Sequence, residues 1–236
     1  VVWNAIHPPM HHELAQVWDA FANDTNLWVA VLTGAGDKAF TAGNDLKFTA
    51  AGGKGKMPPS GFAGLTQRFD LEKPIIAAVN GFAMGGGFET ALSCDIILSA
   101  DTAIFALPEV KVGFFAAAGG VQRLSRYIGR LAAQELVLTG RSITAEEALA
   151  MGVVNAVVPK AELLEAAMTK AAQITAVSPS AVKASKRVLN ALAVAEGLPE
   201  SLAFSRQVVA DLSQTEDFKE GVQAFVEKRK AKWLNR

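Results

Sequence analysis

The chain of 236 residues contains one cysteine, Cys94, so it cannot form an intramolecular disulfide, and this scarcity is typical of a reducing compartment. It also lacks a charge excess, because 23 basic residues balance 23 acidic ones, which argues against nucleic acid as a partner. No apolar run approaches the roughly 18 residues of a membrane-spanning helix, and no signal peptide is visible. We expect a cytoplasmic protein without a membrane span; because the chain begins at Val1 rather than at a methionine, a preceding targeting segment stays open.

Apolar residues, by contrast, are abundant. They make up 50% of the chain against 19% charged residues, which predicts one domain with a sizeable core, or one domain with an appendage. Helical spacing of apolar residues and short apolar runs that end at glycine or proline alternate along the first part of the chain, so an α/β core is expected. The expected elements are helices over Met10–Asn23 and Phe88–Cys94 and strands over Leu27–Thr33, Ile75–Gly81, Ile96–Ser99, Ala103–Ala106 and Val153–Val158.

The pattern becomes helical after Gly119. Thr144 and Glu147 have the spacing of a capping box, and the helix that they begin should stop near Gly152. We expect a core over residues 1–177 and a helical C-terminal region over residues 178–236. Further helices are predicted over Ala161–Ala176, Pro179–Leu192, Pro199–Leu212 and Glu216–Trp233.

Three consecutive glycines, Gly85 to Gly87, stand between a predicted strand and a predicted helix. The start of a helix leaves backbone N–H groups unpaired, and glycine lets a ligand approach that backbone closely. Glu89 follows in the first helical turn, and Glu109 follows twenty residues later, after Leu107 and Pro108. Each acid alone is typical of an ordinary helix start or loop, but together with the glycines they predict a site for acid and base chemistry.

Three other motifs invite a functional interpretation. The segment from Gly34 to Ala39 imitates a dinucleotide-binding fingerprint, but turn-forming residues follow it instead of a helix, so we reject this interpretation. His7, His11 and His12 lack the spacing of a metal site and are expected at the surface. The basic run over residues 228–232 fits either a solvated helix end or a phosphate contact.

Five segments together resemble the enoyl-CoA hydratase/isomerase, or crotonase, family, and the resemblance runs from about Asn4 to the C-terminus. Their order along the chain is also that of the family. The segments are Ala39–Lys47, Asn80–Glu89 with the following Cys94-Asp95-Ile96, Leu107–Gly113, Gly119–Leu124 and Leu138–Gly140.

The resemblance implies an α/β, crotonase-like spiral of ββα repeats with an all-helical C-terminal oligomerisation region. It also implies a homotrimer or a dimer of trimers, and an acyl-CoA thioester as the substrate. Coenzyme A is then part of the substrate, and no separate cofactor or metal is expected.

By position in the family, the backbone N–H groups of Asn44 and Gly86 would form an oxyanion hole for the thioester oxygen. Glu89 and Glu109 would be the catalytic acids and bases. The resemblance further implies contacts with substrate or coenzyme A at Ala42, Asp45, Leu46, Lys47, Ala117, Phe225 and Lys228.

Retention of both glutamates favours a 2-enoyl-CoA hydratase. An enoyl-CoA isomerase or a specialised acyl-CoA dehydratase would use the same site, and a non-catalytic scaffold of the same fold is the alternative of another class. Two departures bear on the choice. Phe114 to Ala117 replace a stretch that usually contains Pro-Gly, which predicts a narrower pocket near the catalytic water, and Asn44 replaces the commoner alanine.

Overall fold

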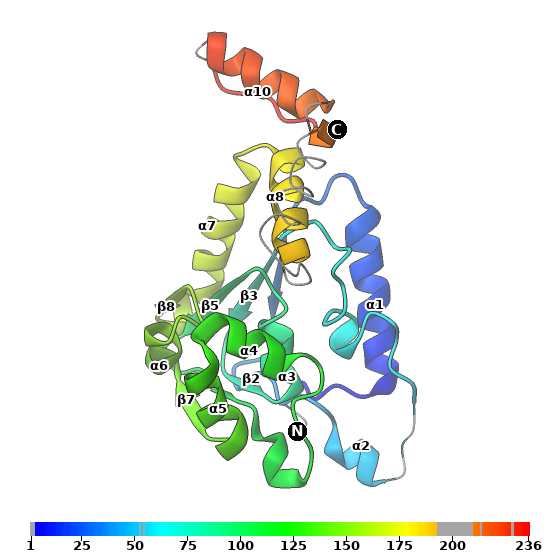
Figure 1. The fold of residues 1–236 in the computed structure, drawn as a ribbon, viewed down its shortest axis with the longest axis vertical. Helices are drawn as coiled ribbons and strands as arrows, with labels where there is room; N and C mark the ends of the chain where they lie inside the picture. Colours follow the sequence, from blue (N-terminus) through cyan, green and yellow to red (C-terminus); the bar gives the residue numbers. More distant parts are fainter. Residues whose placement is uncertain (1–2, 52, 54, 193–209, 213, 228) are drawn as a thin grey trace. The chain divides into compact units, whose positions relative to one another are not determined.

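The computed structural model describes residues 3–51, 53, 55–192, 210–212, 214–227 and 229–236 (Figure 1). The chain divides into two compact units, which are described separately. Unit 1 comprises Val1–Ala20, Val31–Arg68 and Ile75–Met168, and unit 2 comprises Phe21–Ala30, Phe69–Pro74 and Thr169–Arg236. The predicted division between residues 177 and 178 stays a prediction.

The first sheet has four strands in the order β1-β3-β5-β8. All residues of its inner strand β3 are buried, and their apolar sequence shows no alternation, as is typical of a parallel strand covered on both faces. Strands β3 and β5 are parallel, as are β5 and β8. The bounds are β1 (Ala30–Thr33), β3 (Ile75–Val79), β5 (Ile96–Ala100) and β8 (Ala156–Val158).

The second sheet has the order β2-β4-β6-β7. Its first three strands are parallel, whereas β7 runs antiparallel to β6. The bounds are β2 (Ala39–Thr41), β4 (Phe82–Met84), β6 (Ile104–Ala106) and β7 (Ser142–Thr144). Strands β1, β3 and β5 of the first sheet alternate along the chain with β2, β4 and β6 of the second, so that each turn of the chain adds one strand to each sheet. This winding is the predicted spiral, and the predicted fold class is confirmed.

Helices and short 3-10 turns connect these strands (Figure 1). Helix α1 (Pro8–Asn23) begins with two prolines, which are favoured in a first helical turn because that turn needs no N–H donors. Helix α6 (Ala145–Ala150) has the predicted capping box between Thr144 and Glu147. The other connecting elements are α2 (Leu46–Ala50), η1 (Phe62–Gly64), α3 (Gly86–Ala91), η2 (Pro108–Val112), α4 (Gly120–Ile128), α5 (Arg130–Thr139), η3 (Lys160–Glu162) and α7 (Leu163–Thr175).

Buried apolar side chains around α3 hold unit 1 together. The Phe88 and Phe105 rings pack with centroids 5.2 Å apart, and both side chains are almost fully buried together with Leu124 and Ile143. Burying a side chain of this size contributes about 2 kcal/mol, so this packing fixes the short helix that carries Glu89. Cys94 is buried in this core.

Unit 2 contains helices α8 (Pro179–Leu192) and α10 (Glu216–Glu227), and the bounds of α8 are those predicted. Most of the predicted helix over Pro199–Leu212 lies outside the described residues. The prediction that the last helix continues to Trp233 is wrong, because α10 ends at Glu227. The Glu220 carboxylate accepts hydrogen bonds from the Arg229 guanidinium at 2.6 Å and from the Lys232 N–H at 2.6 Å, which folds the chain back against α10.

The prediction that all three histidines lie at the surface is wrong for His11, which is 1% exposed. Its Nδ1 accepts a hydrogen bond from the Ala63 N–H at 3.0 Å, and its ring packs edge-on against Phe62. His11 therefore supports η1 from inside unit 1. His12 is exposed, as predicted.

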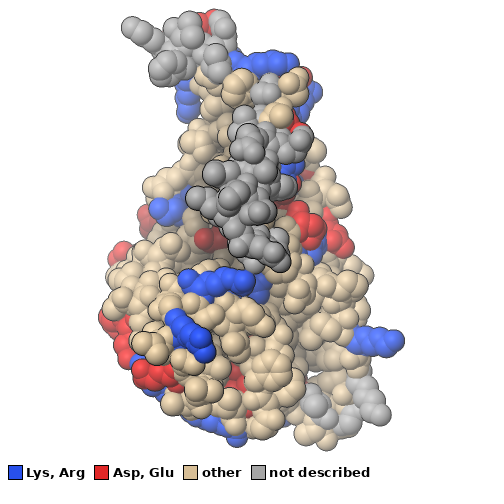
Figure 2. Space-filling model, in the orientation of Figure 1, with Lys and Arg blue, Asp and Glu red and all other residues tan. Residues whose placement is uncertain are grey.

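The surface reflects the balanced charge. On the face drawn in Figure 2, basic and acidic side chains lie in small separate groups among uncharged residues. Among the described helices, none is long and apolar enough to cross a membrane. The described residues also contain no cluster of histidine, cysteine or acidic side chains that could hold a metal ion.

Candidate active site

The triglycine turn joins β4 to α3 and permits no side chains. Gly85 has φ 53° and ψ −123°, a conformation that residues with a side chain rarely adopt. A Cβ atom at Gly85 would lie 2.8 Å from Oε1 of Glu109, and one at Gly86 would lie 2.4 Å from the Phe62 ring. One at Gly87 would lie 2.2 Å from the Thr41 carbonyl oxygen. The turn is therefore enclosed by three other segments of unit 1.

The segment that contains Asn44 lies against this turn. A Cβ atom at Gly43 would be 2.9 Å from the Gly86 nitrogen and 2.5 Å from the Met84 carbonyl oxygen, so the two backbones are in contact. A short parallel bridge anchors the segment on its other side, where the Ile6 N–H donates to the Gly43 carbonyl at 2.8 Å. The structure thus brings together the two backbone segments that the sequence predicts for an oxyanion hole.

Glu89 lies in the first turn of α3 and is 3% exposed. Its Oε1 accepts a hydrogen bond from the Gly120 N–H at 2.8 Å, and a Cβ atom at Gly120 would lie 2.9 Å from that oxygen. Burial raises the pKa of Glu89 to about 7, the Gly120 N–H opposes this shift, and the charge of Glu109 adds to it. Near neutral pH the side chain can therefore either give or take a proton.

Glu109 lies at the start of η2 and is half-buried. Its Oε1 faces Gly85, and its Oε2 is buried without a hydrogen-bond partner among the described residues. Burial raises the pKa of this carboxyl group as well. A buried carboxylate oxygen without a donor is costly, and the backbone N–H of Glu109 itself only partly opposes the upward shift of the pKa.

The two carboxyl groups belong to one site, because Oε1 of Glu109 faces Gly85, Glu89 lies in the first turn of the helix that starts at Gly86, and the charge of Glu109 acts on Glu89. Their surroundings differ in a useful way. Glu89 accepts the Gly120 N–H on Oε1, whereas Oε2 of Glu109 has no donor among the described residues and only the N–H of Glu109 itself lowers the pKa of that carboxyl group. The arrangement can hold one base and one acid beside a backbone N–H group, as proton transfer next to a developing oxyanion requires.

The residues predicted to contact coenzyme A begin beside this site. Asp45 caps α2, because its Oδ1 accepts hydrogen bonds from the N–H groups of Lys47 and Phe48 at 3.0 Å each. Leu46 and Lys47 are exposed, and Ala42 is half-buried. The Asp45 carboxylate thus has a structural role, and contact of these four residues with coenzyme A stays a prediction.

The other predicted contacts are distributed more widely. Ala117 is exposed and follows Phe114 and Phe115, whose exposed rings stack with centroids 5.5 Å apart. Phe225 lies in α10 of unit 2, and Lys228 lies outside the described residues. Their contacts with a substrate stay predictions.

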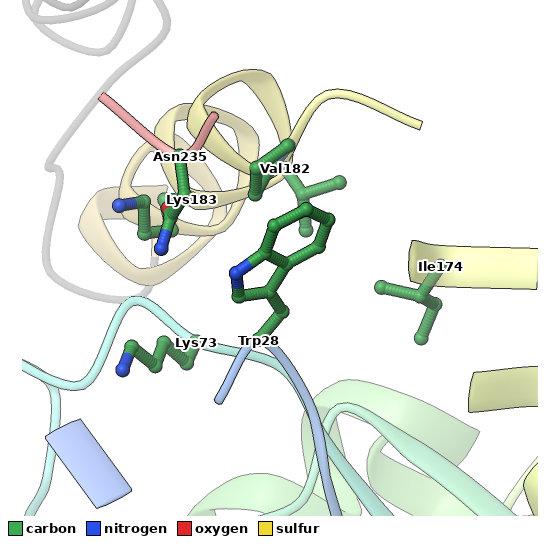
Figure 3. A pocket seen from close by; sticks show the side chains of 7 residues that line it. Trp28, Lys73, Ile174, Val182, Lys183 and Asn235 are labelled. Atoms are coloured by element: carbon green, nitrogen blue, oxygen red, sulfur yellow. The ribbon is translucent and has the colours of Figure 1, made fainter. Parts of the chain in front are cut away.

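Two cavities lined by described residues have neither glutamate in their lining. A cavity of about 200 Å³ in unit 1 has Trp18, Phe40, Thr41 and Ala63 among its lining residues but neither glutamate. In unit 2 a space of about 10 Å³ has room for about one water molecule. Figure 3 shows it around Trp28, with Ile174 and Val182 on one side of the indole and Lys73 and Lys183 on the other. Neither space replaces the surroundings of the triglycine turn as the candidate active site.

Sequence reasoning missed the residues that support the site. Phe62 covers Gly86, Thr66 accepts a hydrogen bond from the Phe62 N–H at 2.9 Å, and the Arg123 guanidinium donates to the Thr66 carbonyl at 2.7 Å. Phe62 and Thr66 lie between the predicted strands Leu27–Thr33 and Ile75–Gly81, where no helix or strand is predicted, and no local pattern distinguishes them. His11 did carry a signal, since it precedes Leu14 by three residues and falls on the apolar face of α1.

A two-sheet spiral that places a pair of buried carboxyl groups beside a glycine-lined backbone defines a crotonase-fold enzyme. The chain belongs to the enoyl-CoA hydratase/isomerase family, whose model matches residues 1–236. It is 44% identical to a carnitinyl-CoA dehydratase of Salmonella arizonae, over 98% of this chain and 90% of that protein.

Solved structures agree with this assignment. An enoyl-CoA hydratase of Mycobacterium tuberculosis superposes with a TM-score of 0.93 at 37% identity, over 100% of this chain and 92% of the other. A carnitinyl-CoA hydratase of Mycobacterium avium superposes with a TM-score of 0.76 at 42% identity, over 98% and 90% of the two chains.

Proposed function

We propose that the protein catalyses the reversible addition of water across the 2,3 double bond of a 2-enoyl-CoA thioester. One observation carries the proposal: two carboxyl groups with raised pKa values act on each other beside the triglycine turn, since Glu109 faces Gly85 and Glu89 follows Gly86 in the first turn of α3. Hydration needs a base for the attacking water and an acid for the neighbouring carbon. Two neighbouring carboxyl groups with raised pKa values can supply both.

In the proposed hydration, the thioester oxygen binds between the N–H groups of Asn44 and Gly86. Glu89, as a carboxylate, takes a proton from water while the water oxygen bonds to C3. The C2=C3 electrons move toward the thioester, and the negative charge develops on its oxygen. Protonated Glu109 then delivers its proton to C2. Dehydration is the same path in reverse, with Glu109 as the base and Glu89 as the acid that protonates the departing hydroxyl.

The surroundings of each carboxyl group support these roles. Burial raises the pKa of both carboxyl groups, that of Glu89 to about 7, so each can take up a proton and release it during the reaction. A preorganised N–H donor to the oxyanion is worth roughly 3–4 kcal/mol in related chemistry. The proposed steps move protons and stabilise one oxyanion, so they require no redox or metal cofactor.

The proposal leaves two further choices, the direction of the reaction and the acyl group of the substrate. Identity to a carnitinyl-CoA dehydratase reaches 44%, against 35–38% for several enoyl-CoA hydratases, which favours dehydration of carnitinyl-CoA as a second candidate function. An enoyl-CoA isomerase would need only Glu109 to carry a proton from C2 to C4, and would leave the hydrogen-bonded Glu89 without a role. Assembly as a trimer or a dimer of trimers, and a cytoplasmic location, stay predictions.

The test offers crotonyl-CoA, carnitinyl-CoA and a 3-enoyl-CoA separately and identifies the products by mass spectrometry. We expect a 3-hydroxyacyl-CoA from crotonyl-CoA, and a loss of roughly 100- to 10,000-fold in kcat for Glu89→Gln and for Glu109→Gln. Glu146→Gln, at an exposed glutamate of α6, is the matched control and should retain activity. Double-bond migration that depends on Glu109 alone would show that the protein is an isomerase. A much higher kcat/KM for carnitinyl-CoA would establish the second candidate.

A further inference from the structure

Arg123 lies on α4, between two segments that enclose the candidate active site. Its half-buried guanidinium donates from Nη2 to the Thr66 carbonyl at 2.7 Å and from Nη1 to the Ala118 carbonyl at 3.3 Å. These acceptors are more than fifty residues apart in the sequence. A single rigid, always charged side chain therefore ties together two walls of the site.

The first wall leads from Thr66 to the predicted oxyanion donor. Thr66 is 1% exposed, and its Oγ1 accepts a hydrogen bond from the Phe62 N–H at 2.9 Å. The Phe62 ring covers Gly86 so closely that a Cβ atom there would lie 2.4 Å from it. The position of the Gly86 N–H thus depends on Phe62, which Thr66 and Arg123 hold in place.

The second wall leads from Ala118 to the predicted base. Gly119, with φ 103°, follows Ala118 and turns the chain into α4. The next N–H group, that of Gly120, donates to Oε1 of Glu89 at 2.8 Å. Fixing the Ala118 carbonyl therefore fixes the donor that orients Glu89, and the positive charge of Arg123 favours the carboxylate form of Glu89.

We propose that Arg123 is a positioning residue for the hydration reaction, which sets the geometry of Gly86 through Thr66 and the orientation and charge of Glu89 through Ala118. This inference rests on the proposed function. Arg123 does not touch the reacting atoms. It holds the Glu89 carboxyl group and the Gly86 N–H group in fixed positions relative to each other. A misplacement of about 1 Å in such a site can cost about 100-fold in rate.

The two functions of Arg123 can be separated by substitution. Arg123→Lys keeps the positive charge but lacks the planar guanidinium that donates to both carbonyl groups at once. Arg123→Gln loses the guanidinium and the charge. Arg126→Gln removes an exposed charge from the same helix and is the matched control. The other charged or titratable groups that act on Arg123 or Glu89 are Glu109, Tyr127, Cys94 and Arg126.

The experiment measures kcat and KM for crotonyl-CoA between pH 5 and pH 9. We expect kcat to fall roughly 10- to 100-fold in both Arg123 variants, with a smaller change in KM. Hydration needs ionised Glu89, so activity should rise with pH through the pKa of the base. This rise should move to higher pH in Arg123→Gln, because a positive charge that lowers the pKa of Glu89 is lost, and should stay in place in Arg123→Lys.

A role in stability alone would lower the melting temperature without moving the pH profile, and that result would overturn the proposal. So would wild-type kcat in both variants. Infrared titration of the Glu89 carboxyl group, assigned with Glu89→Gln, reports the same shift without turnover. If the wild-type protein hydrates no 2-enoyl-CoA, the proposed function fails, while this titration still shows whether Arg123 sets the ionisation of Glu89.

Discussion

Two buried acidic sites, one in each unit, differ in how completely their oxygens are hydrogen-bonded. In unit 2, Asp217 is 1% exposed and accepts four hydrogen bonds, which come from the N–H and hydroxyl of Ser180 and the N–H groups of Leu234 and Asn235. In unit 1, Glu89 accepts the Gly120 N–H, and Oε2 of Glu109 has no partner among the described residues.

The difference separates an acid that stabilises the fold from acids that are kept reactive. Four donors recover the cost of burying Asp217 and join α8, α10 and the C-terminal tail. The glutamates of unit 1 recover less of that cost, and burial therefore raises their pKa values. A buried acid with too few donors destabilises the fold and is typical of a functional site.

The largest predicted effect is that of Glu89→Gln, which should lower kcat for hydration roughly 100- to 10,000-fold while raising stability at pH 8. In the folded protein the pKa of Glu89 is about 7 instead of 4.5, so only the folded state holds this proton between these values. The free energy of unfolding of the wild-type protein therefore falls as the pH rises from 4.5 to about 7. At about 1.4 kcal/mol per pKa unit, the loss is about 3 kcal/mol. Glutamine keeps the Gly120 bond without a buried charge.

Urea unfolding of the wild-type protein and Glu89→Gln at pH 5 and pH 8 measures this effect. The stability advantage of the variant should be present at pH 8 and small at pH 5. If Glu89→Gln were less stable than the wild type at pH 8, the Glu89 carboxylate would stabilise the fold, as we expect of Asp217.

Asp217→Asn should have the opposite effect, with lower stability and unchanged chemistry. An amide nitrogen would face two of the donors that the carboxylate now accepts, which we expect to cost about 3 kcal/mol in the free energy of unfolding. Chemical denaturation with hydratase assays below the unfolding transition measures both quantities. Glu216→Gln, one residue earlier and exposed, is the control and should change stability by less than about 0.5 kcal/mol. Loss of kcat in the folded Asp217→Asn protein would contradict the separation of the two kinds of acid.

His11 extends the comparison to a buried base. Burial, followed by the charges of His12 and His7, lowers its pKa from 6.5 to about 4, so below pH 6.5 the unfolded chain binds a proton that the folded protein excludes. Stability should therefore fall as pH drops from 6.5 to about 4, by about 3 kcal/mol. Thermal unfolding across this range should show a shallower pH slope for His11→Asn, whose side-chain oxygen can still accept the Ala63 N–H. His12→Asn, at an exposed position, should keep the wild-type slope.

Sequence patterns predicted the parts of the fold that local chemistry determines. Helix α8 begins at Pro179 and ends at Leu192 as predicted, because its start signal and apolar spacing lie within the segment itself. The strands β2, β4 and β7 escaped prediction, whereas the equally short β6 and β8 were predicted from apolar runs. Three residues cannot establish a period of two, so such strands are predictable only where an apolar run marks them. The end of α10 was mispredicted because the distant acceptor Glu220, and not a local stop signal, turns the chain back.

The candidate site divides in the same way. The triglycine turn and the two glutamates stand out in the sequence because their residue types are required by backbone geometry and proton transfer. Phe62, Thr66 and Arg123 act through contacts between segments that are far apart in the chain, so only the fold reveals them. The opposing environments of Glu89 and Glu109 likewise depend on Gly120 and on burial, which no local pattern encodes.

The smallest predicted effect concerns Thr144, whose capping box with Glu147 is exposed and fully hydrogen-bonded. The Glu147 N–H donates to the Thr144 hydroxyl at 3.2 Å, and the Thr144 N–H donates to the Glu147 carboxylate at 2.8 Å. Thr144→Ala removes one of these bonds where water can replace it, so we expect a loss of about 1 kcal/mol in the free energy of unfolding. Thr144→Ser keeps the hydroxyl and should restore most of that loss.

Chemical denaturation of these two variants at pH 7 measures the difference. Both substitutions at Thr144 should leave kcat unchanged, because the capping box lies at the junction of β7 and α6 and Glu89 lies in α3. If Thr144→Ala lowered the free energy of unfolding by about 3 kcal/mol or more, the exposed hydrogen bonds of Glu147 would stabilise the fold as much as the buried ones of Asp217. Burial would then no longer explain why Asp217 should contribute more to the stability of the fold than Glu147.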